Sequence, residues 1–247
     1  MILYPTIELQ NGHCVSLSRG DLNEPQIWHV DPVKKACEFA AVGAEWMHVT
    51  DFDALAKTGS NADLIEEIIL HAGLPVQVAG GIRTMDQVEH WVEKGAGRVV
   101  IGTAAVLNPQ FIHQAAKAYP DQIVLAVDVR DGLVTTDGWK SQSAFTPEAF
   151  VKAFVNVPLA GILYTDVNSD VGDSEGSLAV VSALAEMSRT PLIVSGLVKT
   201  VDDISRLKYI RNIAGAIVGR ALFNRSIDLA EALELARPEA EPVAEFI

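Results

Sequence analysis

The chain has 247 residues, 49% of them hydrophobic, and a formal net charge of −13 at pH 7. That length suits one large α/β barrel, and the apolar content supports a continuous core and excludes a disordered protein. The negative charge argues against nucleic acid or an anionic membrane as a partner, because both bind to basic surfaces.

Short apolar runs alternate with longer amphipathic runs from end to end. Such apolar runs are typical of parallel strands that are buried on both faces. Eight strands are expected, at Ile2–Glu8, Trp46–Asp51, Val76–Ala79, Arg98–Gly102, Gln122–Asp128, Gly161–Asp166, Leu192–Ser195 and Ala214–Gly219. A helical stretch follows each strand, so the pattern predicts a (β/α)8 TIM barrel, an α/β fold, as a single domain over residues 1–236.

Capping motifs in the sequence also predict where several helices begin. Asp31-Pro32 and Thr146-Pro147 each combine an N-cap residue with proline at the first helical position. Thr84 and Gln87 have capping-box spacing. The segment 237–247 is rich in proline and glutamate, and we expect it to be a flexible acidic tail.

No targeting signal or disulfide framework is expected. The apolar start lacks a basic region and soon reaches Glu8, so it does not resemble a signal peptide. No uncharged run reaches the roughly 18 residues of a membrane-spanning helix. The only cysteines are Cys14 and Cys37, which suits a reducing compartment. We therefore expect a soluble cytoplasmic protein, and we expect it to be a monomer.

The sequence contains an internal repeat, in which motifs of the first half recur in the second half at a nearly constant offset. The segment from Pro75 to Thr84 reappears from Pro191 to Thr200, and a second glycine motif at Gly102 reappears at Gly219. At a similar offset Glu8 corresponds to Asp128, and Asp51 to Asp166. Two equivalent half-barrels make two equivalent half-sites, each with one acid and one pair of glycine loops.

Glu8 and Asp128 are expected at the ends of the first and fifth strands, on opposite sides of the barrel mouth. Chemistry in this fold gathers at that end of the strands. A single acid there is most simply a loop cap, but two at symmetry-related positions indicate a general acid and a general base facing one substrate. Thr165 ends the sixth strand, where its hydroxyl can hydrogen-bond a substrate. Trp139 either stacks on a planar ring or covers the barrel rim.

Four glycine loops follow strands in symmetric pairs. Glycine lets the backbone approach a phosphate closely with its N–H groups. Turn chemistry alone explains any one loop, but four in pairs predict a long ligand with a phosphate at each end. The predicted phosphate-binding residues are Gly80, Gly81, Arg83, Gly102, Thr103, Ser195, Gly196, Gly219 and Arg220. His48, within an apolar strand, is expected in the core, and no metal-ligand spacing occurs, so no metal site is predicted.

Several longer motifs strengthen this interpretation. The most specific are Gly43-Ala-Glu-Trp-Met-His-Val49, Val76-Gln-Val-Ala-Gly-Gly-Ile-Arg83, Val99-Val-Ile-Gly-Thr-Ala-Ala105, Val127-Asp-Val-Arg-Asp-Gly132, Thr136-Asp-Gly-Trp139, Tyr164-Thr-Asp166 and Val218-Gly-Arg-Ala-Leu222. Together they resemble the HisA branch of the HisA/HisF family of histidine-biosynthesis barrels, from about Ile2 to Leu235. The resemblance implies a two-fold-repeat barrel that isomerises a bisphosphorylated aminoimidazole carboxamide ribotide (ProFAR), a small phosphosugar, without a cofactor.

The resemblance also implies roles for single residues. Glu8 stands where the family has its base, Asp128 where it has its proton donor, and Thr165 where it has a helper. Trp139 would cover the imidazole, and Asp170 matches an aspartate of the loop after the sixth strand.

The chain departs from the family pattern at four places. Glu8 replaces an aspartate, Ser16 and Ser169 each replace an arginine, and Leu197 replaces a glycine, which is expected to crowd the second phosphate loop. These changes leave open a divergent relative, either a non-catalytic barrel that binds a phosphorylated metabolite or a partner protein, or an isomerase with an altered substrate. Phosphoribosylanthranilate is one such substrate, with Arg19 as a partner for its carboxylate.

Overall fold

Eight parallel strands close into a barrel in the computed structural model, which describes residues 1–168 and 175–238. The strands run in the order β10-β11-β12-β1-β4-β5-β6-β7, and pairing of β10 with β7 closes the ring. Their bounds are β1 (Ile2–Gln10), β4 (Met47–Asp51), β5 (Val76–Ala79), β6 (Arg98–Ile101), β7 (Ile123–Arg130), β10 (Gly161–Asp166), β11 (Leu192–Ser195) and β12 (Ile213–Val218). The predicted (β/α)8 barrel is confirmed.

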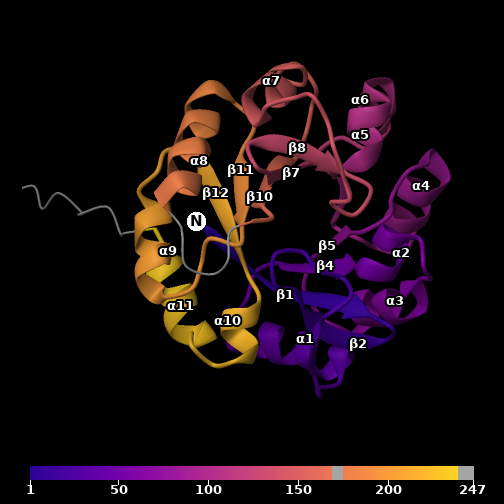
Figure 1. Cartoon of the computed structure of the whole chain (residues 1–247). Coiled ribbons are helices and arrows are strands. Elements are labelled where there is room, and N and C mark those ends of the chain that lie inside the picture. The colour runs from indigo at the N-terminus through magenta and orange to yellow at the C-terminus, as the bar shows by residue number, and fades with distance from the viewer. Residues whose placement is uncertain (169–174, 239–247) are drawn as a thin grey trace, which may run out of the picture.

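Helices surround the strands as an outer ring (Figure 1). Their bounds are α1 (Pro32–Val42), α2 (Phe52–Ala56), α3 (Ala62–His71), α4 (Met85–Glu93), α5 (Thr103–Leu107), α6 (Pro109–Ala118), α7 (Pro147–Lys152), α8 (Glu175–Met187), α9 (Val201–Lys208), α10 (Arg220–Phe223) and α11 (Leu229–Ala236). Asp31 caps α1, Thr146 caps α7, and Thr84 with Gln87 forms a capping box on α4, as the sequence predicts. None of the helices described is long and apolar enough to cross a membrane.

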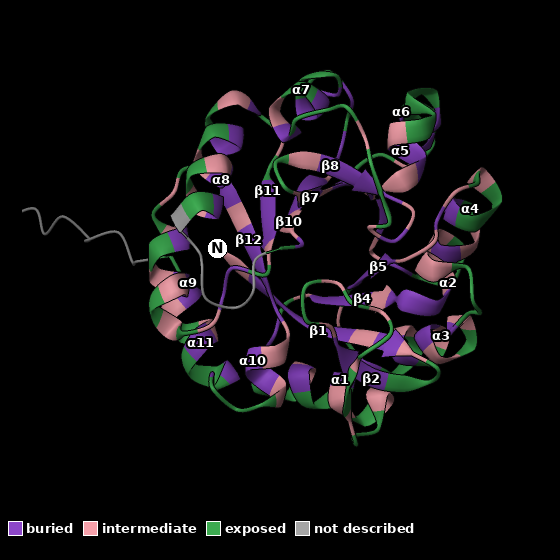
Figure 2. Ribbon diagram, in the orientation of Figure 1, coloured by how far each residue is buried: buried purple, intermediate pink, exposed green. Residues whose placement is uncertain are grey.

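Alternation along the strands divides the core into two layers. Odd-numbered residues of β1 such as Leu3 and Ile7 pack outward against the helices, whereas Tyr4 points into the barrel. The inner layer is formed by eight buried residues, Tyr4, Ala79, Val100, Val124, Ala126, Leu163, Ile193 and Ile217. Figure 2 shows burial concentrated on the strands and on the helix faces turned toward them. This inner layer makes the barrel a packed core beneath its mouth.

Two hairpins that the sequence analysis did not predict extend opposite strands of the barrel. β2 (His13–Ser16) pairs antiparallel with β1, and β8 (Leu133–Thr136) pairs antiparallel with β7. A further strand pairs with each, β3 (Gln26–Trp28) with β2 and β9 (Ser141–Gln142) with β8. The hairpins lengthen β1 and β7, so Glu8 and Asp128 lie two residues before the strand ends rather than at them.

The sequences of the two turns indicate these hairpins, although the sequence analysis did not use them. Asn11 and Gly12 have φ of 49° and 76°, and Asp131 and Gly132 have φ of 52° and 76°. Positive φ at both central residues is the type I′ turn, which Asn-Gly and Asp-Gly favour. The two hairpins therefore belong to the internal repeat.

Gly80 provides a test of how tightly the first glycine loop is packed. Its φ is 109°, and a Cβ there would lie 2.3 Å from the Asp51 carbonyl oxygen. Gly80→Ala is expected to lower the free energy of unfolding by about 1–3 kcal/mol through overpacking, in addition to about 1–2 kcal/mol of backbone strain. Gly132→Ala is the matched control, because its φ is 76° but no atom lies within 4 Å. Equal losses in urea denaturation would contradict this packing.

Candidate active site

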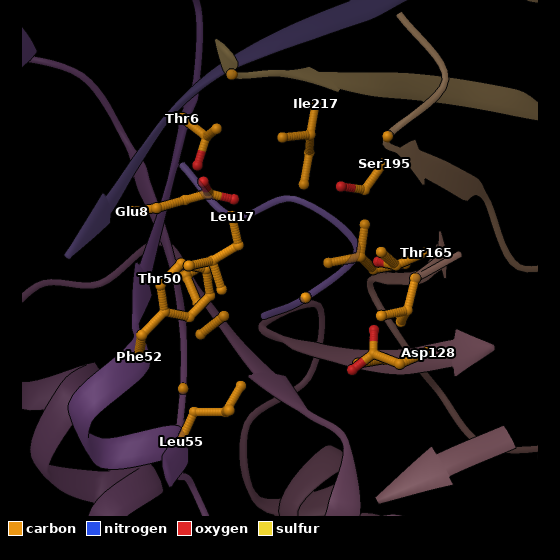
Figure 3. A pocket seen from close by; sticks show the side chains of 18 of the residues that line it. Thr6, Glu8, Leu17, Thr50, Phe52, Leu55, Asp128, Thr165, Ser195 and Ile217 are labelled. Atoms are coloured by element: carbon orange, nitrogen blue, oxygen red, sulfur yellow. The ribbon is translucent and has the colours of Figure 1, made fainter. Parts of the chain in front are cut away.

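The predicted site residues that the structure describes meet in one pocket at the C-terminal ends of the strands. Figure 3 shows it, with Glu8 and Asp128 on opposite sides. The residues concerned are Glu8, Arg19, Gly80, Gly81, Arg83, Gly102, Thr103, Asp128, Trp139, Thr165, Ser195, Gly196, Gly219 and Arg220. Asp170 and Ser169 lie outside the described residues. Among those described, no cluster of three His, Cys, Asp or Glu side chains is arranged to hold a metal ion.

Glu8 projects into the pocket from β1 on the inner side of the barrel. Its surroundings withhold water from the carboxylate, which raises its pKa to about 7, while the Arg220 guanidinium acts in the opposite direction. A carboxyl group with a pKa near 7 can exchange a proton at neutral pH, which is what a general acid or base requires.

Asp128 faces Glu8 from β7, four strands away around the eight-stranded ring. Burial raises its pKa, and hydrogen bonds from Trp139 and Thr165 lower it in part. The Trp139 indole Nε1 donates to Asp128 Oδ2 at 3.0 Å. Trp139 therefore contacts a predicted catalytic group directly, instead of only covering the rim.

The loop that carries Trp139 is anchored at several points. Asp137, Gly138 and Trp139 have φ of 53°, 64° and 64°, three consecutive left-handed residues. The Asp137 backbone N–H donates to Thr103 Oγ1 at 3.0 Å, and the Asp137 carboxylate pairs with Lys57 at 3.1 Å. A left-handed tryptophan is uncommon, and strain of this kind persists where surrounding contacts determine the conformation.

Arg130 is a site residue that the sequence analysis missed. Its guanidinium donates to the Trp139 carbonyl at 2.9 Å and to the Arg19 carbonyl at 3.0 Å. It therefore joins the loop between β8 and β9 to the segment that follows β2. Arg130 precedes the Asp131-Gly132 turn, so recognising that hairpin would have placed its side chain beside the mouth.

The first pair of glycine loops is held by a cation bonded to the backbone. Gly80 and Gly81 have φ of 109° and 68°, and both lie against the backbone of β4 and α2. The Arg83 guanidinium donates to the carbonyls of Ala54, Gly81 and Leu55 at 2.9–3.1 Å. Arg83 thus fixes the loop, and its role as a phosphate ligand stays a prediction.

The second pair repeats the geometry of the first. Gly102 has φ −112° and ψ −96°, and Gly219 has φ −116° and ψ −99°. Gly196 has φ 82° and lines the pocket. The Arg220 guanidinium donates to the Leu17 carbonyl at 2.5 Å, which places its charge beside Glu8.

The expectation for Leu197 is wrong. Its side chain is 1% exposed and packs in the outer core, away from the pocket. Leu197 lies beyond the end of β11, where Gly196 and Val198 line the pocket and the Leu197 side chain between them packs in the outer core. Ser16 is also buried, and its Oγ accepts a hydrogen bond from Trp28 Nε1 at 2.9 Å.

Asp51 and Asp166, the second pair of repeated acids, hold loops. The Asp51 carboxylate accepts from the Asn61 backbone N–H and side-chain amide, both at 2.7 Å. The Asp166 carboxylate accepts from Ser177 Oγ at 2.7 Å and from the Asn168 backbone N–H at 3.0 Å. Each acid ties the end of its strand to the segment leading into the next helix.

The fold and pocket define a two-fold-repeat (β/α)8 barrel with two facing carboxyl groups and paired glycine loops. A family model described as "Histidine biosynthesis protein" matches residues 2–228. The chain belongs to this family.

Curated relatives extend over the full length. A protein of Ruegeria sp. (strain TM1040) named 1-(5-phosphoribosyl)-5-((5-phosphoribosylamino)methylideneamino) imidazole-4-carboxamide isomerase 1 is 59% identical over 247 residues, covering 100% of both chains. An isomerase 2 of the same name from Ruegeria pomeroyi is 57% identical over 246 residues, again covering 100% of both. The isomerase 2 of strain TM1040 is 39% identical over 235 residues, covering 94% of this chain and 98% of that one.

The contact between Trp139 and Asp128 predicts a pKa change. Trp139→Phe removes the indole N–H but keeps an aromatic ring against Phe52. A hydrogen bond to a carboxylate stabilises its charged form, so its loss should raise the pKa of Asp128 further. Carboxyl ¹³C NMR titration of Asp128 measures this, with Trp91→Phe on the outer helix α4 as the control. An unchanged pKa of Asp128 in Trp139→Phe would contradict the assignment.

Proposed function

We propose that this protein is an aldose–ketose isomerase of histidine biosynthesis that acts on the bisphosphorylated substrate named for its relatives, by acid and base catalysis at Asp128 and Glu8. The observation that carries the proposal is the pair of carboxyl groups facing one pocket, both with raised pKa values. Relatives bearing that isomerase name match over the whole chain.

The reaction is an Amadori rearrangement, in which an aminoaldose becomes an aminoketose. Asp128 donates a proton to the ribose ring oxygen, so the ring opens and the nitrogen forms a protonated imine with C1. Glu8 then removes the proton from C2, and the electron pair moves to give an enolamine. A proton then returns to C1 while the C2 hydroxyl gives up its proton and becomes the ketone, so atoms and electrons balance without an oxidant or reductant.

The raised pKa values suit these roles in different ways. Burial raises the pKa of Asp128, and this favours the protonated form that a proton donor needs. Glu8, with a pKa of about 7, is substantially ionised at neutral pH and is basic enough to remove a proton beside an imine. Thr165, hydrogen-bonded to Asp128, holds that carboxyl group in place.

The two glycine loop pairs support a substrate with a phosphate at each end. Gly80 and Gly102 flank one side of the pocket, and Gly196 and Gly219 flank the other. With a net charge of −13, the protein must hold these anions by local backbone N–H groups and the nearby Arg83 and Arg220. Trp139 lines the same pocket, where its ring can cover the imidazole.

Conservative substitutions of the two carboxyl groups test the mechanism. Asp128→Asn and Glu8→Gln should each lower kcat by about 10²–10⁴-fold, because neither amide transfers the proton. Binding of substrate should change little, since shape and size are kept. Turnover at the wild-type rate in either variant would remove that residue from the mechanism, and complementation of a histidine auxotroph by the wild-type gene tests the activity itself.

Shortening the base tests whether the site is adapted to glutamate. Glu8→Asp withdraws the carboxylate by about 1.5 Å, and a misplacement of about 1 Å is worth on the order of 10²-fold in rate. We therefore expect a lower kcat with the pKa of the base still visible in the pH profile. A higher kcat in Glu8→Asp would mean that glutamate overreaches.

The glycine loops predict where anions bind. Crystals grown in high sulfate or phosphate should show one anion at Gly80, Gly81 and Gly102, and another at Gly196 and Gly219. Because Leu197 lies in the outer core, the two sites are expected to fill comparably. Two empty sites at high phosphate would count against any bisphosphate substrate.

A further inference from the structure

A single arginine joins the two loops that surround the indole of Trp139. Arg130 Nη1 donates to the Trp139 carbonyl at 2.9 Å, and Nη2 donates to the Arg19 carbonyl at 3.0 Å. The two loops lie far apart in the chain, one between β8 and β9 and the other after β2. Arg130 is not among the described residues that line the pocket, so it acts on the site through the groups that it holds.

The backbone of Arg130 is itself fixed, which gives its guanidinium a defined starting point. Arg130 pairs with Leu133 in the hairpin of β7 and β8, and its carbonyl accepts a hydrogen bond from Gln142 Nε2 at 3.0 Å. Arg130 follows Asp128 by two residues along β7, and residues two apart in a strand point to the same side. The strand that carries the acid therefore also carries the arginine that reaches the Trp139 loop.

The Trp139 end of this contact fixes a hydrogen-bond donor to Asp128. Trp139 has φ of 64°, a left-handed conformation that tryptophan rarely adopts and that persists only where surrounding contacts determine it. Arg130 holds its carbonyl, while its indole Nε1 donates to Asp128 Oδ2 at 3.0 Å. The allowed directions of a side chain depend on its own backbone angles, so the bond at the carbonyl helps to aim the indole N–H at the carboxylate.

The Arg19 end of the contact holds the segment that packs on the indole ring. Gly20 has φ of 67°, and a Cβ there would lie 2.8 Å from Trp139 Cε3 and 2.7 Å from Val167 Cγ1. Only a residue without a side chain fits so close to the ring. By bonding the carbonyl of the residue before Gly20, Arg130 keeps this segment against the indole.

We propose that Arg130 is a positioning residue: by bonding the Trp139 and Arg19 carbonyls together, it holds the Trp139 indole N–H on Asp128. The proposal rests on the proposed function, because it assigns to Asp128 the role of proton donor. A planar guanidinium presents its donors in a fixed geometry, which suits two carbonyls from different loops. Without Arg130, each loop keeps its other contacts but loses the bond that joins it to the other loop.

The charged groups near Asp128 leave this route through Trp139 as the one by which Arg130 acts. The charged and titratable side chains that line the pocket with Asp128 are Glu8, Arg19, His48, Arg83, Asp166 and Arg220, and the Lys57–Asp137 ion pair lies beside the Trp139 loop. Burial lowers the pKa of His48 to about 3, so its imidazole is neutral. Burial raises the pKa of Asp128 and hydrogen bonds from Trp139 and Thr165 lower it, whereas no charged side chain of the described residues contributes. The Arg130 charge therefore does not act on Asp128 directly.

The indole N–H resonance of Trp139 tests the proposal without any need for activity. In the wild type this ¹H–¹⁵N signal should follow the ionisation of Asp128, because the proton is donated to that carboxylate. Arg130→Lys keeps the positive charge but replaces the planar fork by one ammonium group. The signal should then no longer titrate, and its exchange with D₂O should become about tenfold faster.

Arg98→Lys is the matched control. Arg98 begins β6, at the end of the strands opposite the pocket, and its guanidinium donates to the Tyr4 hydroxyl at 2.9 Å. The Trp139 signal should titrate in this variant as it does in the wild type. Unchanged titration and exchange of the same signal in Arg130→Lys would refute the proposal.

A measurement on the unmodified protein covers the case in which Arg130→Lys does not fold. In wild-type protein labelled with ¹⁵N-arginine, the two Nη groups of Arg130 should give separate signals, because each donates to a different carbonyl. A single averaged Nη signal, as free rotation of the guanidinium produces, would overturn the proposal.

Kinetics show whether the effect of Arg130 passes through Trp139. Arg130→Lys should lower kcat by about 10–10²-fold, since a misplacement of about 1 Å is worth on the order of 10²-fold in rate. In a Trp139→Phe background the same substitution should change kcat by less than about twofold, because the indole N–H is already absent. Equal losses in the two backgrounds would show a general effect on the loops and would refute the proposal.

The two levels of inference can fail separately. Full turnover in Asp128→Asn would remove the proposed role of Asp128 as proton donor, whereas the Trp139 signal would still report on the contact. If Asp128→Asn is inactive but the Trp139 signal of Arg130→Lys titrates as in the wild type, the mechanism stands and only the role of Arg130 is refuted.

Discussion

The constraint on which this structure depends is the alternation of side chains around a closed parallel barrel. Because pairing of β10 with β7 closes the barrel, alternate residues of each strand point inward. A shift of one residue in the register of a strand would turn its inward-facing side chains outward and its outward-facing side chains inward. The same alternation stacks Tyr4, Thr6 and Glu8 in successive layers of β1, from packed interior to open mouth. Glu8 is half-buried because apolar and polar layers lie beneath it, and its raised pKa follows from that position.

The internal repeat explains why the two carboxyl groups face one another. Glu8 and Asp128 occupy equivalent places in the two halves, and β1 and β7 are separated by four steps around a ring of eight. Their environments nevertheless differ. Asp128 accepts a hydrogen bond from Trp139, whereas Glu8 experiences the charge of Arg220. Glu8 and Asp128 can therefore take different roles, one as base and one as acid, because different neighbouring groups act on their pKa values.

The sequence predicted the barrel, because buried parallel strands are continuous apolar runs and the capping motifs mark the helices. It also predicted which side chains meet at the mouth, because the strand ends converge there independently of the conformation of the loops. It did not predict the two hairpins, although Asn11-Gly12 and Asp131-Gly132 signalled them. The guanidinium contacts of Arg83 and Arg130 depend on the paths of neighbouring loops, which no spacing along the chain specifies. Leu197 was misplaced because the direction of its side chain depends on the path of the loop after the left-handed Gly196.

Three arginines at the mouth donate to backbone carbonyls, and none of the three forms an ion pair with an acidic side chain within residues 1–168 and 175–238. Arg83 bonds the carbonyls of Ala54 and Leu55, Arg130 bonds those of Arg19 and Trp139, and Arg220 bonds that of Leu17. A carbonyl fixes the guanidinium without neutralising it, so Arg83 and Arg220, which line the pocket, keep their positive charge there. In a chain of net charge −13 this matters, because an arginine paired with a carboxylate would offer little attraction to an incoming phosphate. The same contacts hold the loops, so the arginines that anchor the loops also bring positive charge to the mouth.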